Sequence, residues 1–176
     1  MTGMRLEVHQ RLSELSATAG KEYGKLVQKL LAIALLESGA ESLTDRSTQG
    51  IDLEATFRGK KRAIEVKTTE SGSVSLGKKD LEGLAAREAD GMRAYVAVLG
   101  NRFLDEWTFA RFQAGELSPS QSYSITQLRP YRDSEMERAV AKPFADAVLK
   151  HADAAARGGQ KALDDVLAAF PAYRRA

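Results

Sequence analysis

Three charged side chains in the first half of the chain have the types and the spacing of a site for a divalent metal ion. Glu65 and Lys67 flank Val66 in a predicted strand, and because side chains alternate along a strand, both point to one face. Asp52 lies on the polar face of the strand predicted just before it. Neighbouring side chains of an antiparallel pair lie roughly 5 Å apart, so a β-hairpin can bring two carboxylates and one ammonium group together.

Such a group of side chains suits the hydrolysis of phosphodiesters. Mg²⁺ prefers oxygen ligands, commonly one or two carboxylates completed by waters and phosphate oxygens. A metal held by Asp52 and Glu65 would stabilise the charge that grows on a scissile phosphate and would lower the pKa of a bound water. Lys67 would orient that water or stabilise the developing negative charge. Glu22, in the first turn of a predicted helix, is a fourth candidate that would complete the site or bind a second metal.

Each of these residues also has an ordinary structural explanation. A Glu-x-Lys pattern is common on solvated strand faces, Asp52 follows a glycine by two positions as turn residues do, and Glu22 fits any first helical turn. The order of several elements favours the site: a helix with an early glutamate, Gly-Ile-Asp, a hairpin carrying Glu-Val-Lys, then a helix and an apolar strand.

The hydrophobic patterns predict the elements that would position these residues. Apolar residues at helical spacing predict a helix over 20–38 that ends at Gly39, preceded by a shorter helix over 6–15. Alternation and turn signals predict strands over 42–46, 51–58 and 61–68, with the hairpin turn at Gly59-Lys60. A loop over 72–77, a helix over 78–89 and a strand over 92–99 that is buried on both faces follow.

The remaining third of the chain is expected to be mainly helical. We expect a strand within 104–112, a polar loop or hairpin over 115–127, a helix over 134–157 with a possible interruption near Pro143, and a short final helix over 160–170. The whole order indicates an α/β fold, a mixed central sheet flanked by helices.

Composition restricts the class of protein and of metal site. The 176 residues, 43% hydrophobic and 28% charged, suit one globular domain, or one domain with a helical appendage. The absence of cysteine excludes disulfides and thiolate ligands, and the presence of only two histidines, His9 and His151, argues against a histidine-based zinc site. No apolar run approaches the roughly 20 residues that span a bilayer, and residues 1–10 do not resemble a signal peptide, so a cytoplasmic location is expected. A net charge of +2 permits a nucleic-acid partner without indicating one.

Three segments, 20–22, 45–52 and 63–69, give the chain a resemblance to a known family. Over residues 20–100 it resembles the PD-(D/E)XK nuclease superfamily, and within it the archaeal-type Holliday junction resolvases. The resemblance implies a restriction-endonuclease-like fold and Mg²⁺, for which Mn²⁺ would substitute. It implies that Asp52, Glu65 and the Val66 backbone carbonyl bind the metal, that Lys67 is catalytic, and that Glu22 is the family's helix glutamate.

Further residues follow from the same resemblance as DNA contacts. Ser47 matches a polar residue before the metal site, and Lys78 or Lys79 matches a basic residue on the helix after the motif. Independently of the resemblance, basic residues of the first long helix, Lys21, Lys25 and Lys29, would bind phosphates, although a solvated surface explains any one of them better.

Two departures from the family pattern limit what the resemblance implies. Ile51 stands where the family usually has proline, and the residues after about 101 have no counterpart in the compact resolvases. We therefore divide the chain into a nuclease core over 1–112 and a C-terminal extension over 113–176, packed on the core.

The expected function is that of a metal-dependent DNA endonuclease, and the resemblance to the Holliday junction resolvases implies selectivity for branched structures. The alternatives are a restriction or defence nuclease, a non-catalytic nucleic-acid-binding module on the same fold, and an unrelated α/β domain whose charges coincide by chance. The expected partners are DNA and, because relatives of this fold often cut two strands as dimers, a second copy of the chain; no membrane partner is expected. Apolar C-terminal residues would either support that dimer or cover the sheet; they are Phe144, Val148, Val166, Leu167 and Phe170.

Overall fold

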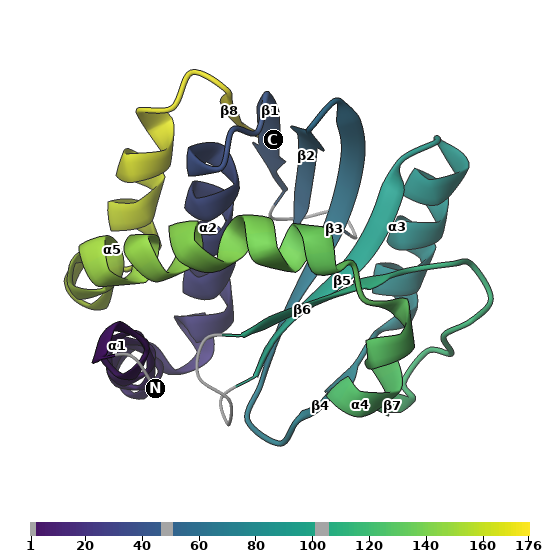
Figure 1. The fold of residues 1–176 in the computed structure, drawn as a ribbon, viewed down its shortest axis with the longest axis horizontal. Coiled ribbons are helices and arrows are strands. Elements are labelled where there is room, and N and C mark those ends of the chain that lie inside the picture. The colour runs from purple at the N-terminus through teal and green to yellow at the C-terminus, as the bar shows by residue number, and fades with distance from the viewer. Residues whose placement is uncertain (1–2, 47–50, 101–105) are drawn as a thin grey trace.

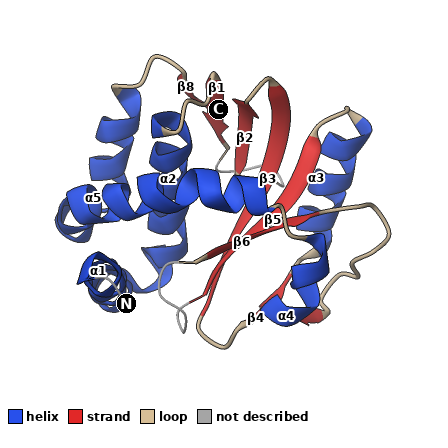
Figure 2. Cartoon of the chain, viewed as in Figure 1, coloured by secondary structure: helices blue, strands red, loops and turns tan. Residues whose placement is uncertain are grey.

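The computed structural model describes residues 3–46, 51–100 and 106–176. A six-stranded mixed sheet with strand order β6-β5-β3-β2-β1-β8 forms the middle layer (Figures 1 and 2). The helices α1 (Gly3–Ala19), α2 (Tyr23–Glu37) and α5 (Ser134–Ala168) share one hydrophobic cluster with one face of the sheet. The helices α3 (Lys78–Ala89) and α4 (Ile125–Leu128) contribute to a second cluster on the opposite face. This architecture confirms the predicted mixed sheet flanked by helices, with a mainly helical C-terminal part.

The hairpin of β2 (Leu53–Phe57) and β3 (Lys60–Thr69) forms with its turn one residue earlier than predicted, and β2 begins after Asp52, which the prediction had placed within the strand. Arg58 and Gly59 occupy the two turn positions with φ angles of 51° and 70°. Positive φ at both central residues is typical of the tight turn that matches the twist of antiparallel strands. Because the first residue of β2, Leu53, pairs with Ile64, β3 continues beyond the start of β2. The backbone groups of this part of β3 have no partner in β2. Asp52 lies at this position.

The helix α2 is buried along nearly its whole length and supplies the centre of the larger cluster. A short 3₁₀ helix, η1 (Gly20–Glu22), leads into it. At its end Gly39, with φ +97°, donates to the Leu36 carbonyl at 3.1 Å and Ala40 donates to the Leu35 carbonyl at 3.0 Å. These two bonds form the glycine-dependent helix end that the sequence predicted. The next strand, β1 (Ser42–Asp45), pairs antiparallel with β2.

The helix α3 connects two parallel neighbours in the sheet, β3 and β5 (Arg93–Gly100). The strand β5 is buried from Ala94 to Leu99, as its continuous apolar run predicted. The strand β6 (Trp107–Arg111) pairs antiparallel with β5 at the edge, and the rest of the strand predicted over 104–112 lies partly outside the described residues.

Two sequence predictions about connecting segments are wrong. The segment predicted as a loop over 72–77 contains β4 (Ser73–Ser75), which pairs with β7 (Ser122–Ser124) from the segment predicted as a polar loop or local hairpin. Both strands are only three residues long, which is too short to show an alternating pattern. Their partners are distant in sequence, so no turn signal between them indicates the pairing. The helix α4 and a second 3₁₀ helix, η2 (Arg129–Tyr131), follow.

The two helices predicted over 134–157 and 160–170 form as the two halves of α5, which meet at Gly159, whereas the interruption predicted near Pro143 does not occur. Gly159 has φ 63° and ψ −149°, and the chain turns there between two helical halves. Proline removes the hydrogen bond to the carbonyl four residues earlier. That carbonyl, of Ala139, lies 3.1 Å from the Ser38 hydroxyl, which it shares with the Ala34 carbonyl at 2.6 Å, and the helix continues through Pro143.

The C-terminal residues extend the sheet. The strand β8 (Tyr173–Arg175), which the sequence did not predict, pairs parallel with β1. The side chains of Phe144, Val148 and Leu167 are buried inside the chain, and Val166 and Phe170 pack partly buried against the same cluster. These apolar residues therefore cover the sheet and its helices. Among the described helices, none has both the length and the apolar composition of a membrane-spanning segment.

Candidate active site

Asp52 is fixed by the backbone of the neighbouring strand. Its Oδ2 accepts a hydrogen bond from the backbone N–H of Val66 at 2.8 Å, at the point where β3 has lost its β2 partner. In an extended strand the N–H and C=O of one residue point to the same side. The Val66 carbonyl therefore also points toward the side on which Asp52 lies.

Glu65 and Lys67 lie together on the α3 side of the sheet, opposite to Ile64 and Val66, which face α2. The Lys67 Nζ lies 3.0 Å from Glu65 Oε1. It also lies 2.9 Å from Oδ2 of Asp80, which is in the first turn of α3. The backbone N–H of Gly77 donates to the same Asp80 oxygen at 3.1 Å, so the start of α3 orients this third carboxylate.

The electrostatics of the site raise the pKa values of both Glu65 and Lys67. Burial, with the charge of Asp52 as a second cause, raises the pKa of Glu65 to about 7, although Lys67 opposes the rise. Burial lowers the pKa of Lys67, but the nearby carboxylates of Glu65 and Asp80 outweigh it, so the pKa lies above its ordinary value. A divalent cation beside Glu65 and Asp52 would favour the ionised carboxylate.

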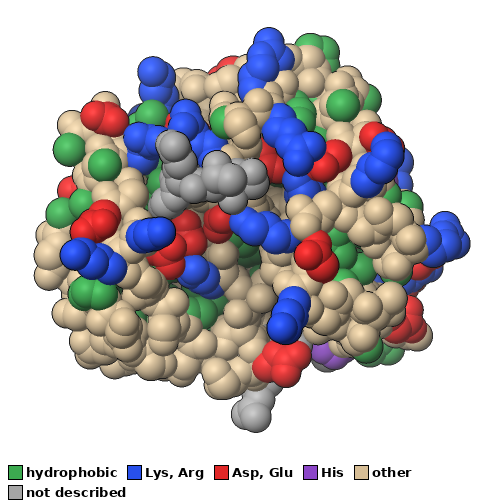
Figure 3. All heavy atoms as spheres, turned by 180° about the vertical axis from the view of Figure 1, so that it is seen from behind, with side chains coloured by type: hydrophobic (Ala, Val, Ile, Leu, Met, Phe, Trp, Pro, Cys, Tyr) green, Lys and Arg blue, Asp and Glu red, His purple; other side chains and the backbone are tan. Residues whose placement is uncertain are grey.

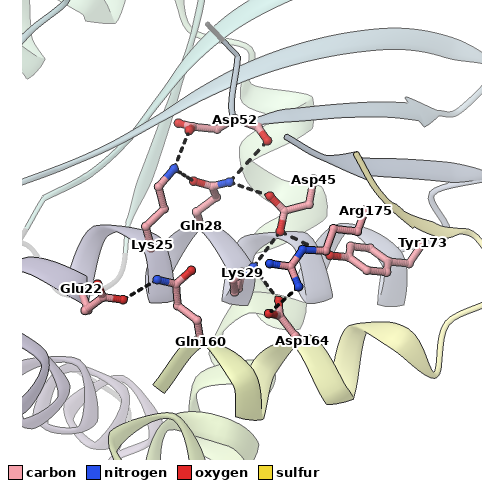
Figure 4. A network of polar contacts seen from close by, with 10 residues as sticks. All are labelled: Glu22, Lys25, Gln28, Lys29, Asp45, Asp52, Gln160, Asp164, Tyr173 and Arg175. Atoms are coloured by element: carbon pink, nitrogen blue, oxygen red, sulfur yellow. Dashed lines mark hydrogen bonds and ion pairs between the residues drawn. The ribbon is translucent and has the colours of Figure 1, made fainter. Parts of the chain in front are cut away.

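The helix α2 contacts Asp52 from the other side of the sheet (Figure 4). Lys25 Nζ lies 3.3 Å from Asp52 Oδ1 and donates to Gln28 Oε1 at 3.0 Å. Gln28 Nε2 lies 3.4 Å from the Asp52 backbone carbonyl. The two carboxylate oxygens of Asp52 are thus held differently, one by the β3 backbone and the other by a partly exposed ammonium group.

Glu22 lies apart from this group of residues. It is exposed in η1, and its carboxylate accepts a hydrogen bond from the Gln160 side chain in the C-terminal half of α5. Figure 4 shows Glu22 directed toward Gln160, whereas Lys25 is directed toward Asp52. The described contacts do not bring Glu22 together with Asp52 or Glu65, and its catalytic role stays a prediction.

Most of the expected DNA contacts fall on the surface or outside the described residues, but Lys29 is buried between Asp45 and Asp164, so the prediction that it contacts phosphate is wrong. Lys21, Lys78 and Lys79 are exposed, and Lys78 Nζ lies 3.6 Å from Glu82 on the same helix. Ser47 lies outside the described residues. On the face opposite to that of Figure 1, Figure 3 shows acidic side chains gathered around a hollow, with Lys and Arg side chains beside them.

Sequence reasoning missed two residues that contact the predicted site. Asp80 had a weak signal, an acidic residue in the first turn of the helix that follows the motif. Gln28 had none, because a glutamine within an apolar helix gives no indication of its partner. Lys25 was expected to bind phosphate, and the structure places it against the predicted metal ligand Asp52.

The donor set fits a hard divalent cation. Asp52, Glu65 and the Val66 carbonyl offer only oxygen atoms, as Mg²⁺ prefers. Over the described ranges 3–46, 51–100 and 106–176, no three His, Asp or Glu side chains form a ready metal cage. One or two carboxylates with waters and substrate oxygens are the usual Mg²⁺ arrangement, so two acidic ligands suffice.

Comparisons with known proteins bear on the fold. No protein-family model matches the sequence, and no curated protein matches it. Among solved structures, the chain is similar to Hjc, a Holliday junction resolvase from the archaeal hyperthermophile Archaeoglobus fulgidus, with a TM-score of 0.51 and 21% sequence identity. The match covers 65% of this chain and 95% of the resolvase. The chain therefore has the fold of an archaeal Holliday junction resolvase.

Proposed function

We propose that this protein is a Mg²⁺-dependent endonuclease that hydrolyses phosphodiester bonds of DNA, with Mn²⁺ able to replace Mg²⁺. The observation that carries the proposal is the approach of Asp52, Glu65 and Lys67 at the point where β3 extends beyond β2. The fold shared with a Holliday junction resolvase supports DNA as the substrate and a selectivity for branched structures.

The side chains divide the work by their chemistry. Asp52, Glu65 and the Val66 carbonyl would hold the metal, which when bound supplies positive charge to the scissile phosphate and lowers the pKa of a water. Lys67 stays protonated between Glu65 and Asp80, so it can hold an attacking water or a phosphate oxygen. Asp80 orients Lys67 and does not itself need to touch the substrate.

The surface residues would bind the DNA backbone. Lys21, Lys78 and Lys79 expose ammonium groups that would contact phosphates in a salt-dependent way, with Ser47 as a further polar contact. Glu22 would join the site, or hold a second metal, only after its carboxylate leaves Gln160. A homodimer would allow two cuts on opposing strands.

The test is a cleavage assay with Mg²⁺ or Mn²⁺ on a four-way junction, linear duplex DNA, single-stranded DNA and RNA. We expect cleavage of the junction that disappears in EDTA and in the variants Asp52→Asn, Glu65→Gln and Lys67→Met. Asp165→Asn and Lys161→Met remove the same charges from exposed residues of α5 that pair with each other, and both should cut normally.

Each other outcome has a definite meaning. Preferred cutting of linear duplex would indicate a restriction or defence nuclease in place of a resolvase. Saturable DNA binding without cutting of any substrate would indicate a non-catalytic binding module. Full activity in Asp52→Asn and Glu65→Gln would refute the site.

A further inference from the structure

A buried polar network connects the C-terminal residues of the chain with Asp52 (Figure 4). Its inner members are Gln28 and Lys29 on α2 and Asp45 at the end of β1. Its outer members are Asp164 on the second half of α5 and the β8 residues Tyr173 and Arg175. We call these six residues the α2–β1 network.

The inner members are almost completely removed from solvent. Gln28, Lys29 and Asp45 are 3%, 5% and 3% exposed. Asp45 Oδ1 accepts a hydrogen bond from Gln28 Nε2 at 2.9 Å, and its Oδ2 lies 2.9 Å from Lys29 Nζ. Replacing a buried ion pair by apolar side chains of similar volume is often neutral or stabilising, so the presence of this pair is weak evidence for a role in stability.

The network contacts Asp52 through the side-chain amide of Gln28 and through a backbone hydrogen bond from Arg46. Gln28 Nε2 lies between Asp45 and the backbone carbonyl of Asp52, which is 3.4 Å away, and Gln28 Oε1 holds Lys25 beside the Asp52 carboxylate. The N–H of Arg46, next to Asp45, donates to the same Asp52 carbonyl at 2.9 Å. Displacement of Asp45 would therefore displace the residue that we propose as a metal ligand.

The C-terminal residues hold the other side of the network. Asp164 Oδ1 lies 2.6 Å from Lys29 Nζ, and Asp164 Oδ2 lies 3.4 Å from Arg175 Nη1. The Tyr173 hydroxyl donates to Asp45 Oδ2 at 3.4 Å. Asp45 is the register partner of Arg175, and the N–H of Ala176 donates to the Asp45 carbonyl at 3.1 Å.

We propose that Asp164, Tyr173 and Arg175 are positioning residues, which hold the Lys29–Asp45 pair so that Gln28 fixes the backbone of Asp52 for metal binding. The inference rests on the proposed function. The charges of the network explain the role of Asp164. The positive charges of Lys29 and Arg175 balance the negative charges of Asp45 and Asp164, so loss of the Asp164 charge leaves Lys29 paired with Asp45 alone. Lys29 would then compete with Gln28 for Asp45.

The test measures Mn²⁺ affinity by electron paramagnetic resonance, which does not depend on cleavage. We expect Asp164→Asn to weaken Mn²⁺ binding about fivefold, less than the roughly tenfold typical when a direct hydrogen-bond partner of a metal ligand is lost, because Asp164 acts through Lys29, Asp45 and Gln28. The matched control is Asp165→Asn, which removes the same charge from the next residue, whose partner is Lys161 on the surface. The control should bind as the wild type does, and Asp164→Glu should restore part of the affinity.

A second variant keeps the test decisive if Asp164→Asn does not fold. The double variant Tyr173→Phe and Arg175→Gln keeps the backbone pairing of β8 and alters two side chains that are not buried. We expect it to weaken Mn²⁺ binding about threefold, which is the loss of roughly one hydrogen bond.

The outcomes separate this inference from the proposed function. Unchanged Mn²⁺ affinity in folded Asp164→Asn, or in the double variant, would overturn the positioning role while the wild type still binds metal and cuts DNA. A lower melting temperature with unchanged affinity would show that the network is merely structural and would also overturn it. A wild-type protein that neither binds Mn²⁺ nor cuts would overturn the proposed function and, with it, this inference.

Discussion

Replacing Glu65 by glutamine should stabilise the metal-free protein at alkaline pH. The folded state raises the pKa of Glu65 from 4.5 to about 7, first because the side chain is buried and second because Asp52 is near. Folded protein therefore binds the Glu65 proton more tightly than unfolded protein does. Stability is highest below pH 4.5 with respect to this residue, falls as the pH rises from 4.5 toward 7, and levels off above that.

The size of the effect follows from the separation of the two pKa values. A separation of about 2.5 pH units corresponds to about 3 kcal/mol of unfolding free energy. Part of this decrease in unfolding free energy has already occurred at pH 5. The unfolding free energy of the wild type should therefore fall by about 2 to 3 kcal/mol between pH 5 and pH 8.5 because of Glu65. Glutamine carries no charge, and Lys67 keeps Asp80 as its partner in the variant. The difference in unfolding free energy between Glu65→Gln and wild type should grow by that amount over this range.

Urea denaturation in EDTA at a series of pH values measures this difference. The control is Glu82→Gln on α3, an exposed glutamate that pairs with Lys78 within the helix, for which the difference should stay within about 0.5 kcal/mol. A difference in unfolding free energy between Glu65→Gln and wild type that does not change with pH would refute the reasoning, because it would mean that folding does not raise the pKa of Glu65. Mn²⁺ should reverse the trend in the wild type by binding only the folded state.

Three further substitutions have defined outcomes. Lys25→Met removes the ammonium 3.3 Å from Asp52 Oδ1 and should tighten Mn²⁺ binding up to about fivefold, since the lysine is partly exposed and its attraction is screened. Asp80→Asn removes the charged partner of Lys67 and should lower kcat/KM for junction cleavage about tenfold while it shifts the alkaline limb of the pH–rate profile to lower pH. Gly39→Ala forces a side chain into φ +97° and should lower the unfolding free energy in urea by about 1 kcal/mol or more.

Each of the three has a control or a contrary result. Lys161→Met should leave Mn²⁺ affinity unchanged, and weaker binding in Lys25→Met would mean that the ammonium supports the metal site. An unchanged pH profile in Asp80→Asn would show that Lys67 does not depend on Asp80. Gly24→Ala, inside α2 with nothing closer than Thr68 Oγ1 at 4.0 Å to the added methyl group, should not destabilise the protein, whereas equal losses in both glycine variants would contradict the helix-end argument.

The fold followed from the sequence wherever the signal was local. The apolar spacing of α2, the helical spacing of α3 and the continuous apolar run of β5 all lie within one element, and the structure confirms each. The pairs β4–β7 and β1–β8 were not predictable, because each joins short strands from distant parts of the chain. The break between the two halves of α5 at Gly159 was predicted, whereas the interruption expected near Pro143 does not occur, because the Ala139 carbonyl that proline leaves unpaired meets the Ser38 hydroxyl at the end of α2.

The candidate site divides in the same way. By itself the sequence determined that Glu65 and Lys67 share a strand face, since side chains alternate in any strand, and that a hairpin brings Asp52 beside them. Only the tertiary structure decided that α3 contributes Asp80, that Lys25 and Gln28 meet Asp52, and that Glu22 contacts Gln160. The physical reason is that alternation along a strand is a property of the backbone, whereas the approach of two helices to one sheet position depends on how the whole core packs.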